Sequence, residues 1–287
     1  MDLEFLGVRG TLPYTPDRGS VFGTATPCAV VTGAHGEILI IDAGTGIHAL
    51  GNRLAAAKNM SARRLSIFLT HFHLDHIQGI PFFVPLYSPR TEIVLYAAAD
   101  PEEIRRNLSR LMSDPYFPFP FERTAAKKRF RNIAKKGVSI GSVRVSCASL
   151  IHPQGSAAYR FEEENGAIVF ATDTEHPLSG LDPRLAAFAQ GAQILVYDAT
   201  YFPEEYESGK KGWGHSTWLD GTRIARAAGV RHLILSHFNP DHADRDIRRI
   251  ERLSRREFPN SLCAREGLRL RLKSGSLSVL MPIEKRR

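Results

Sequence analysis

A short stretch of the chain gathers residue types that bind metal ions. Residues 70–76 read THFHLDH, with three histidines and one aspartate directly after the apolar run LSIFL. Imidazole and carboxylate groups are ligands that zinc, iron and manganese accept. Burying three histidines side by side without a metal ion would be costly, because each ring carries polar nitrogens that need partners. The stretch therefore predicts a metal centre rather than a surface cluster.

Single candidate ligands follow three other apolar runs. His152 follows SCASLI, Asp173 follows AIVFAT and His237 follows LILS. Structural zinc sites take four ligands, so this set of donors is too large for one such ion. The number of donors predicts two metal ions, with Asp173 as the ligand that bridges them. The predicted metal ligands are His71, His73, Asp75, His76, His152, Asp173 and His237.

The composition is that of one globular domain over residues 1–287. The chain is 43% hydrophobic and 24% charged, and no Pro- or Ser-rich spacer divides it. Its three cysteines form no CxxC pair, which favours buried thiols in a reducing compartment over a disulfide framework. The sequence contains neither a signal peptide nor an apolar run of membrane-spanning length. We therefore expect a cytoplasmic protein that does not enter a membrane.

Two segments concentrate the positive charge. The formal net charge is +8, and the basic clusters are KKRFRNIAKK, residues 127–136, and RDIRRIERLSRRE, residues 245–257. A basic face can attract phosphate-bearing substrates or nucleic acid. The alternative is a solvated helix face, and the acidic residues interleaved in the second cluster favour that alternative. The first cluster belongs to a basic and aromatic segment, at about residues 100–137, which we interpret as an insert.

The apolar runs predict strands that alternate with helices. Their order fits a sandwich of two sheets with helices outside, although other α/β layouts would give the same pattern. Residues 114–122, DPYFPFPFE, contain three prolines and four aromatics and are expected to form a loop. Asp100 and Ser216 are expected N-caps. Strands are expected at residues 3–8, 28–33, 37–44, 65–70, 92–97, 138–151, 157–163, 167–173, 192–200, 231–238, 268–272 and 277–281, and helices at 46–59, 101–112, 181–191, 216–229 and 241–258.

The metal-binding stretch also carries a family resemblance. THFHLDH resembles the HxHxDH signature of the metallo-β-lactamase superfamily, and IIDAG, residues 40–44, resembles the first motif of that family. His152, Asp173 and His237 resemble its third, fourth and fifth motifs, in the right order. The resemblance covers the whole chain. It implies an α/β fold, a four-layer αββα sandwich, with a dinuclear metal site at one edge of the two sheets.

Two further stretches resemble one branch of that family. DATYFPEE, residues 198–205, and GWGHST, residues 212–217, are similar to paired elements of the ribonuclease Z-like phosphodiesterases. GVRGTLP, residues 7–13, resembles an N-terminal loop of that branch and of related cyclic-phosphate phosphodiesterases. In these enzymes an acid and a histidine form a proton relay beside the metals, which implies Asp198 and His215 here. The segment at about 100–137 reads differently from the arm with which ribonuclease Z grips tRNA.

The resemblance implies a role for each residue. Two metal ions about 3.5–4 Å apart can share a water and lower its pKa toward 7, so that metal-bound hydroxide attacks the phosphorus. The expected catalytic residues are Asp75, His215 and Asp198, with His215 as the general acid for the leaving group. Asp42 would orient a ligand histidine through its second ring nitrogen. One ion would be held by His71, His73 and His152, the other by Asp75, His76 and His237, with Asp173 between them.

Several alternatives stay open at this stage. The expected cofactors are two divalent ions, with zinc as the first expectation and manganese or iron as alternatives. The expected substrate is a nucleotide-type or cyclic phosphodiester, and the alternatives are an RNA-processing endonuclease of ribonuclease Z type and a thioesterase or lactonase. A non-catalytic module is disfavoured, because all seven ligands are present. Related enzymes are often dimers, so a homodimer is also open, with the aromatic loop as a dimer contact, an apolar plug or a wall that stacks a base.

Overall fold

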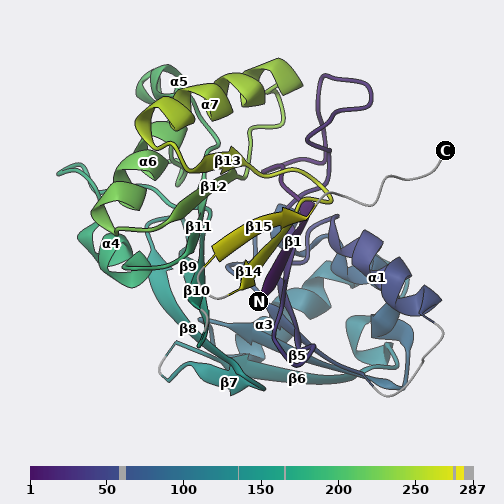
Figure 1. Ribbon diagram of the computed structural model, residues 1–287. Helices are drawn as coiled ribbons and strands as arrows, with labels where there is room; N and C mark the ends of the chain where they lie inside the picture. The colour runs from purple at the N-terminus through teal and green to yellow at the C-terminus, as the bar shows by residue number, and fades with distance from the viewer. Residues whose placement is uncertain (58–62, 135, 165, 274–275, 281–287) are drawn as a thin grey trace.

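Two β-sheets lie face to face at the centre of the molecule, and helices cover their outer faces (Figure 1). The computed structural model describes residues 1–57, 63–134, 136–164, 166–273 and 276–280. Apolar side chains from both inner faces fill the space between the sheets. The Phe68 ring, for example, meets the edges of Tyr159 and Phe161 at centroid distances of 5.5 and 5.3 Å. This is the four-layer αββα order that the resemblance predicted, which confirms the expected fold.

The first sheet has eight strands in the order β15-β14-β1-β2-β3-β4-β5-β6. Strands β3 to β6 run parallel to one another, and the remaining pairs are antiparallel. The strands are β1 Asp2–Gly7, β2 Cys28–Thr32, β3 Ile38–Ile41, β4 Arg63–Phe68, β5 Thr91–Ala97, β6 Lys127–Asn132, β14 Arg269–Lys273 and β15 Ser276–Leu280. Helices α1 Ile47–Ala56 and α3 Pro101–Leu111 pack on its outer face, and short turns of helix, α2 Leu74–Ile77, η1 Ile80–Phe82, η2 Val84–Tyr87 and η3 Phe121–Arg123, connect the strands.

The second sheet has seven strands in the order β13-β12-β11-β10-β9-β8-β7. Strands β10 to β13 are parallel, and β7 to β10 are paired antiparallel. The strands are β7 Val138–Ile140, β8 Val143–Leu150, β9 Ser156–Glu163, β10 Gly166–Ala171, β11 Ile194–Asp198, β12 His232–Ser236 and β13 Ser261–Cys263. Its helices are α4 Pro183–Ala189, α5 Pro203–Glu207, α6 Trp218–Ala227 and α7 Asp244–Glu257. Because parallel strands end at the same edge, β10, β11 and β12 deliver the residues that follow them to one place.

The first basic cluster forms an edge strand, β6, and not a helix face. Lys128 and Phe130 are half-buried, whereas Lys127, Arg129 and Arg131 are exposed. This period of two is that of a strand with one covered face, which explains why the helical alternative was wrong. The rest of the segment at about 100–137 supplies α3 and η3. The segment therefore contributes strand β6 to the first sheet, and α3 and η3 to the layer of helices that packs on that sheet.

Some predicted element boundaries differ from the structure. Helix α6 is capped by Thr217, whose hydroxyl accepts a hydrogen bond from the Asp220 amide at 3.2 Å, and not by Ser216. The Ser216 hydroxyl instead donates to the Thr174 carbonyl at 2.6 Å. The short elements α5 and β13 were not predicted. The expected helical residues 58–59 and the expected strand residue 281 lie outside the described residues.

The structure also describes the three cysteines and the lengths of the helices. Cys28 and Cys263 are buried, Cys147 is partly buried, and all three are free thiols. Among the described residues, no helix is long and apolar enough to cross a membrane.

Candidate metal centre

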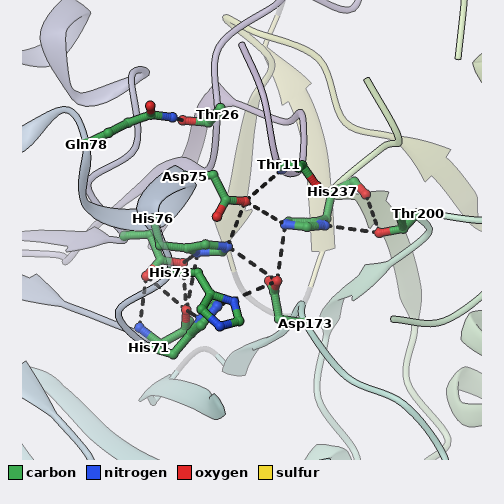
Figure 2. Close-up of polar contacts among 12 residues, drawn as sticks. Thr11, Thr26, His71, His73, Asp75, His76, Gln78, Asp173, Thr200 and His237 are labelled. Atoms are coloured by element: carbon green, nitrogen blue, oxygen red, sulfur yellow. Dashed lines mark hydrogen bonds and ion pairs between the residues drawn. The ribbon is translucent and has the colours of Figure 1, made fainter. Parts of the chain in front are cut away.

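The seven predicted ligands converge where both sheets present the carboxyl ends of their parallel strands. Figure 2 labels His71, His73, Asp75, His76, Asp173 and His237. His71, His73, Asp75 and His76 lie on the connection from β4 into α2. The other three follow β8, β10 and β12. Ligand atoms of these residues fall into groups within 4.8 Å of one another. We call His71, His73 and His152 the first ligand group, and Asp75, His76 and His237 the second ligand group.

The backbone turns sharply at three of the site residues. Asp42, Asp173 and His237 have φ angles of 57°, 58° and 61°. This left-handed region is uncommon for residues other than glycine, and such outliers concentrate at functional sites. The His237 ring also packs so closely on the backbone at position 10 that only glycine fits there, because a Cβ added to Gly10 would lie 2.3 Å from the ring. The turns aim each side chain into the centre instead of along its sheet.

The first ligand group has two imidazole nitrogens facing each other. His73 Nδ1 and His152 Nε2 are 3.1 Å apart. His152 Nδ1 donates to the Gly214 carbonyl at 2.8 Å, and His73 Nε2 donates to Gln154 Oε1 at 2.5 Å. Since the outer nitrogen of each ring carries the proton, the facing nitrogens hold lone pairs. Two lone pairs at this distance suit a shared metal ion.

The second ligand group surrounds one carboxylate oxygen of Asp173. Asp173 Oδ1 lies 3.3 Å from His76 Nε2, 3.2 Å from His237 Nε2 and 3.9 Å from His71 Nε2 (Figure 2). Asp75 Oδ2 lies 3.3 and 3.4 Å from the same nitrogens of His76 and His237. Asp173 thus contacts both ligand groups, as a bridging ligand must.

Hydrogen bonds fix the rings of the second group and of His71 from outside. His76 Nδ1 donates to Asp42 Oδ2 at 2.8 Å, and His71 Nδ1 lies 3.0 Å from the Thr70 hydroxyl. The Thr200 hydroxyl donates to the His237 carbonyl at 2.8 Å, so it accepts the proton of His237 Nδ1 at 3.0 Å. Such outer bonds set the tautomer and leave Nε2 free to bind a metal. Asp42 therefore has the contact that the resemblance implied.

Three imidazole nitrogens of the ligand set, and the second carboxylate oxygen of Asp173, lack hydrogen-bond partners. Buried atoms without a partner include His71 Nε2, His76 Nε2, His237 Nε2 and Asp173 Oδ2. Nearly all buried polar atoms in proteins have a hydrogen-bond partner, so four unpartnered atoms within one set of neighbouring residues need an explanation. Nitrogen and carboxylate donors in this arrangement are a ligand set for divalent ions such as zinc, manganese or iron. The residues present therefore fit divalent metal ions.

The charges of the centre shift its pKa values. Burial acts to raise the pKa of Asp75 and of Asp173, but the neighbouring histidines lower both well below the ordinary range. Burial acts to lower the pKa of His237, but Asp173, Asp75 and Asp198 raise it to about 9. In the first ligand group burial wins, and the pKa of His152 is lowered. The second group is thus the more negative environment.

The predicted relay pair lies beside Asp173. Asp198 is fully buried, and its Oδ2 accepts hydrogen bonds from His215 Nδ1 at 3.0 Å and from the Asp173 amide at 2.9 Å. Its Oδ1 accepts from the amides of Thr200 and Ser216. With both oxygens occupied, Asp198 orients His215 and the Asp173 backbone. The His215 ring stacks on His237 at a centroid distance of 5.1 Å.

Several residues around the centre were not predicted from the sequence. The Thr11 amide donates to Asp75 Oδ2 at 2.8 Å, and Gln154 and Thr200 hold ligand histidines as described above. Thr200 directly follows the motif residues Asp198 and Ala199, which was an available signal. Gln154 gave none, because it lies in a polar turn and its role depends on its positive φ of 63°.

A cavity of about 390 Å³ adjoins the first ligand group. It is lined by His71, His73 and Gln154 on one side, and by Glu103 and Asn107 of α3 on the other. Ser156 also lines it, and its buried hydroxyl has no hydrogen-bond partner. The cavity therefore offers polar groups to a substrate portion that extends from the centre.

The chain is similar to known proteins over most of its length. The model of a family described as the beta-lactamase superfamily domain matches residues 38–274. Ribonuclease Z of Methanosarcina acetivorans is 24% identical over 317 residues, which cover 94% of this chain and 97% of that protein. The structure of the metallo-beta-lactamase fold protein YhfI from Bacillus subtilis has a TM-score of 0.68 at 19% identity, covering 93% of this chain and 97% of that one. A diphosphatase from the PhnP family has a TM-score of 0.66 at 18% identity, covering 95% and 98%.

Proposed function

The chain belongs to the beta-lactamase superfamily, and from that premise we propose that it is a hydrolase that cleaves phosphodiesters with two divalent metal ions. The observation that carries the proposal is the His215–Asp198 pair, which is hydrogen-bonded to the backbone of Asp173 in the ligand set. A metal centre alone would suit many ester hydrolyses. A positioned acid beside it suits a reaction whose leaving group needs a proton.

The residues that would hold the ions are the two ligand groups, with Asp173 between them. Bound divalent ions supply Lewis acidity toward the phosphoryl oxygens and lower the pKa of a nearby water. Zinc is the first choice, because five histidine nitrogens with carboxylates suit it, and manganese and iron are the alternatives. The chain itself contributes the orientation of each ring, through Asp42, Thr200 and Gln154.

His215 would donate the proton to the leaving alkoxide. Its Nδ1 bonds to the buried Asp198 carboxylate, which leaves Nε2 as the nitrogen available to a substrate. Burial acts to raise the pKa of Asp198, but the neighbouring His215 lowers it, so the carboxylate stays charged. The charged carboxylate holds the His215 ring in place through its Nδ1.

The substrate would be a nucleotide-type or cyclic phosphodiester. Support comes from the relative named ribonuclease Z, which matches nearly the full chain, and from the fold shared with a diphosphatase. The cavity beside the first ligand group has room for part of such a substrate. RNA processing of ribonuclease Z type is the second candidate, favoured by that same relative.

The test is a substrate panel with and without a chelator. We expect chelator-sensitive turnover of bis-p-nitrophenyl phosphate. Its rate should be well above the rates for a thioester and a lactone whose leaving groups have matched acidity. The exposed His35 provides a control variant, His35→Ala, that should keep the activity. Turnover of the thioester or lactone alone would reject the phosphodiesterase and support an acyl hydrolase on the same fold.

A further inference from the structure

A groove runs along α7 beside the segments that precede β2 and β14. It has a volume of about 410 Å³ and is lined by Val21, Phe22, Glu251 and five arginines. We call these five residues, Arg248, Arg252, Arg255, Arg256 and Arg265, the arginine groove. All but the half-buried Arg265 are exposed. The groove is distinct from the metal centre, since no metal ligand lines it.

Most of these arginines are unpaired. Arg255 forms an ion pair with Glu251 at 2.9 Å. Across the part of the chain that the structure describes, Arg248, Arg252, Arg256 and Arg265 have no hydrogen-bond or ion-pair partner through their guanidinium groups. Exposed arginines without partners keep all of their donors available for a ligand.

The acidic residues of α7 neutralise only a small part of the groove, because among them only Glu251 lines it, paired with Arg255. Asp244 accepts hydrogen bonds from the Ser20 hydroxyl at 2.5 Å and the Val21 amide at 2.7 Å. The remaining three are Asp246, which accepts from the Ala243 amide, Glu251, which accepts from the Cys263 amide, and Glu257, which pairs with Arg226. Interleaved acids in the sequence had favoured a solvated helix face. Asp244, Asp246 and Glu257 do not line the groove, so one lining carboxylate, Glu251, faces five arginines.

The walls of the groove are held in place. Asp244 ties the segment around Val21 to the start of α7. The Glu266 carboxylate accepts hydrogen bonds from the Thr24 and Ala25 amides at 2.5 and 2.6 Å, and the Glu266 amide donates to the Phe22 carbonyl at 3.0 Å. A ligand therefore meets a formed groove and need not order a loop.

The other basic segment is less available. Arg129 of β6 is paired with Glu92. Lys128 donates to the Thr124 carbonyl at 2.7 Å and to the Thr124 hydroxyl at 2.8 Å. Phosphate binding by these two side chains would first break existing bonds, so α7 is the better anion-binding surface.

We propose that the arginine groove binds the sugar-phosphate backbone of an RNA strand, an inference that rests on the proposed function and names its substrate class. Guanidinium groups bind phosphate oxygens with two parallel hydrogen bonds. Arg248, Arg252 and Arg256 stand four residues apart on α7, so the row spans about 12 Å. A single phosphate cannot reach the whole row, whereas a chain of phosphates can.

The position of the groove connects it to the metal centre. The N-terminal segment that supplies Val21 and Phe22 to the groove also supplies the Thr11 amide to Asp75. At the other wall, α7 begins seven residues after His237. A strand lying in the groove would thus follow the same two segments to the reaction site. Contacts to its phosphates would carry no sequence preference.

The test compares two triple variants of equal charge. The groove variant carries Arg248→Gln, Arg252→Gln and Arg256→Gln, and the control carries Arg90→Gln, Arg110→Gln and Arg144→Gln, three exposed arginines outside the groove. Binding of a fluorescein-labelled single-stranded RNA is followed by anisotropy over a range of salt concentrations. Loss of three phosphate contacts should reduce the slope of log K against log salt by about 2. The control should keep the wild-type slope.

Two further measurements keep the outcomes separate. Turnover of bis-p-nitrophenyl phosphate should be unchanged in the groove variant, since that substrate is too small to reach α7. If the wild-type protein does not turn over this substrate, the proposed function is rejected, whereas the RNA-binding result still stands. Replacing the three arginines by lysine should restore most of the salt slope, because the charge returns. Equal slopes in wild type and groove variant, equal losses in both triple variants, or arginine-dependent binding of acidic lipid vesicles without RNA binding would each overturn the proposal.

Discussion

The two ligand groups of the metal centre differ in burial. All three residues of the second group are buried, whereas His73 and His152 of the first group are partly exposed. The first group borders the cavity that reaches α3. The His215 ring lies close to both groups, with its centroid 5.1 Å from that of His237 and 5.3 Å from that of His152. We therefore expect the substrate to enter along the first group, with His215 within reach of both groups.

The two groups also differ in what holds them. His76 in the second group is bonded to the buried carboxylate of Asp42. In the first group, His73 and His152 are bonded to an uncharged amide and a backbone carbonyl. Hydrogen bonds to ionised groups are roughly twice as strong as neutral ones. We therefore expect the second group to bind its ion more tightly than the first.

The largest effect is expected for Asp173→Ala, because Asp173 contacts both groups. The binding of both ions should be weakened or lost together, and phosphodiester turnover should fall below detection. The measurement is metal content by elemental analysis with turnover of bis-p-nitrophenyl phosphate, and circular dichroism checks that the variant is folded. Retention of full activity would show that the two groups do not share this ligand.

Removal of the relay histidine should separate two classes of substrate. His215→Ala should slow hydrolysis of diesters with alkyl leaving groups by about 10²–10⁴-fold, the usual contribution of a positioned acid. Diesters that release p-nitrophenol should be affected far less, since that group leaves without a proton. The measurement is the hydrolysis rate of both substrate types by the His215→Ala variant, with the His35→Ala variant as the control. Equal losses on both would remove His215 from the role of acid.

A matched pair of variants probes the outer bonds. Asp42→Ala should weaken metal binding by the second group by about 10–100-fold, a range typical for such partners. Gln154→Ala should weaken the first group by less, because it removes an uncharged partner from a partly exposed ring. Competition with a chromophoric chelator gives both affinities. The reverse ranking would contradict the comparison.

The pH dependence of metal binding should also differ between the groups. In the metal-free chain Asp173 and its neighbours raise the pKa of His237 to about 9, although burial opposes them. The ring is therefore protonated at pH 7 and must lose its proton to bind. The carboxylates around His76 also raise its pKa well above the ordinary value, although burial opposes them, so this ring must lose a proton as well. Affinity of the second group should therefore rise by at least about tenfold per pH unit between pH 7 and 9. Burial lowers the pKa of His152, so the first group should change little over that range.

The convergence of the seven candidate ligands was predictable because these residues are chemically distinctive. Histidines and aspartates directly after apolar runs identify strand ends, and parallel strands bring those ends together. The relay pair came from the resemblance of the stretches around Asp198 and His215. Asp42 was found in the same way, and its bond to His76 agrees with that assignment.

Other parts could not be read from the sequence because they depend on side-chain direction. The acids of α7 are interleaved with its arginines along the chain, yet Asp244 bonds to the segment around Ser20, more than two hundred residues away. Similarly, the basic residues 127–132 form an edge strand because β5 was available to pair with them. Gln154 contacts His73 only because of the turn that precedes β9.

The central claim is a dinuclear centre whose activity requires both ligand groups. The most direct measurement is titration of chelator-stripped protein with zinc, with bound metal and phosphodiester turnover followed together. We expect the first equivalent per chain to bind with little turnover and activity to appear as the second equivalent is bound. Full activity at one equivalent, or activity in the metal-free protein, would contradict it.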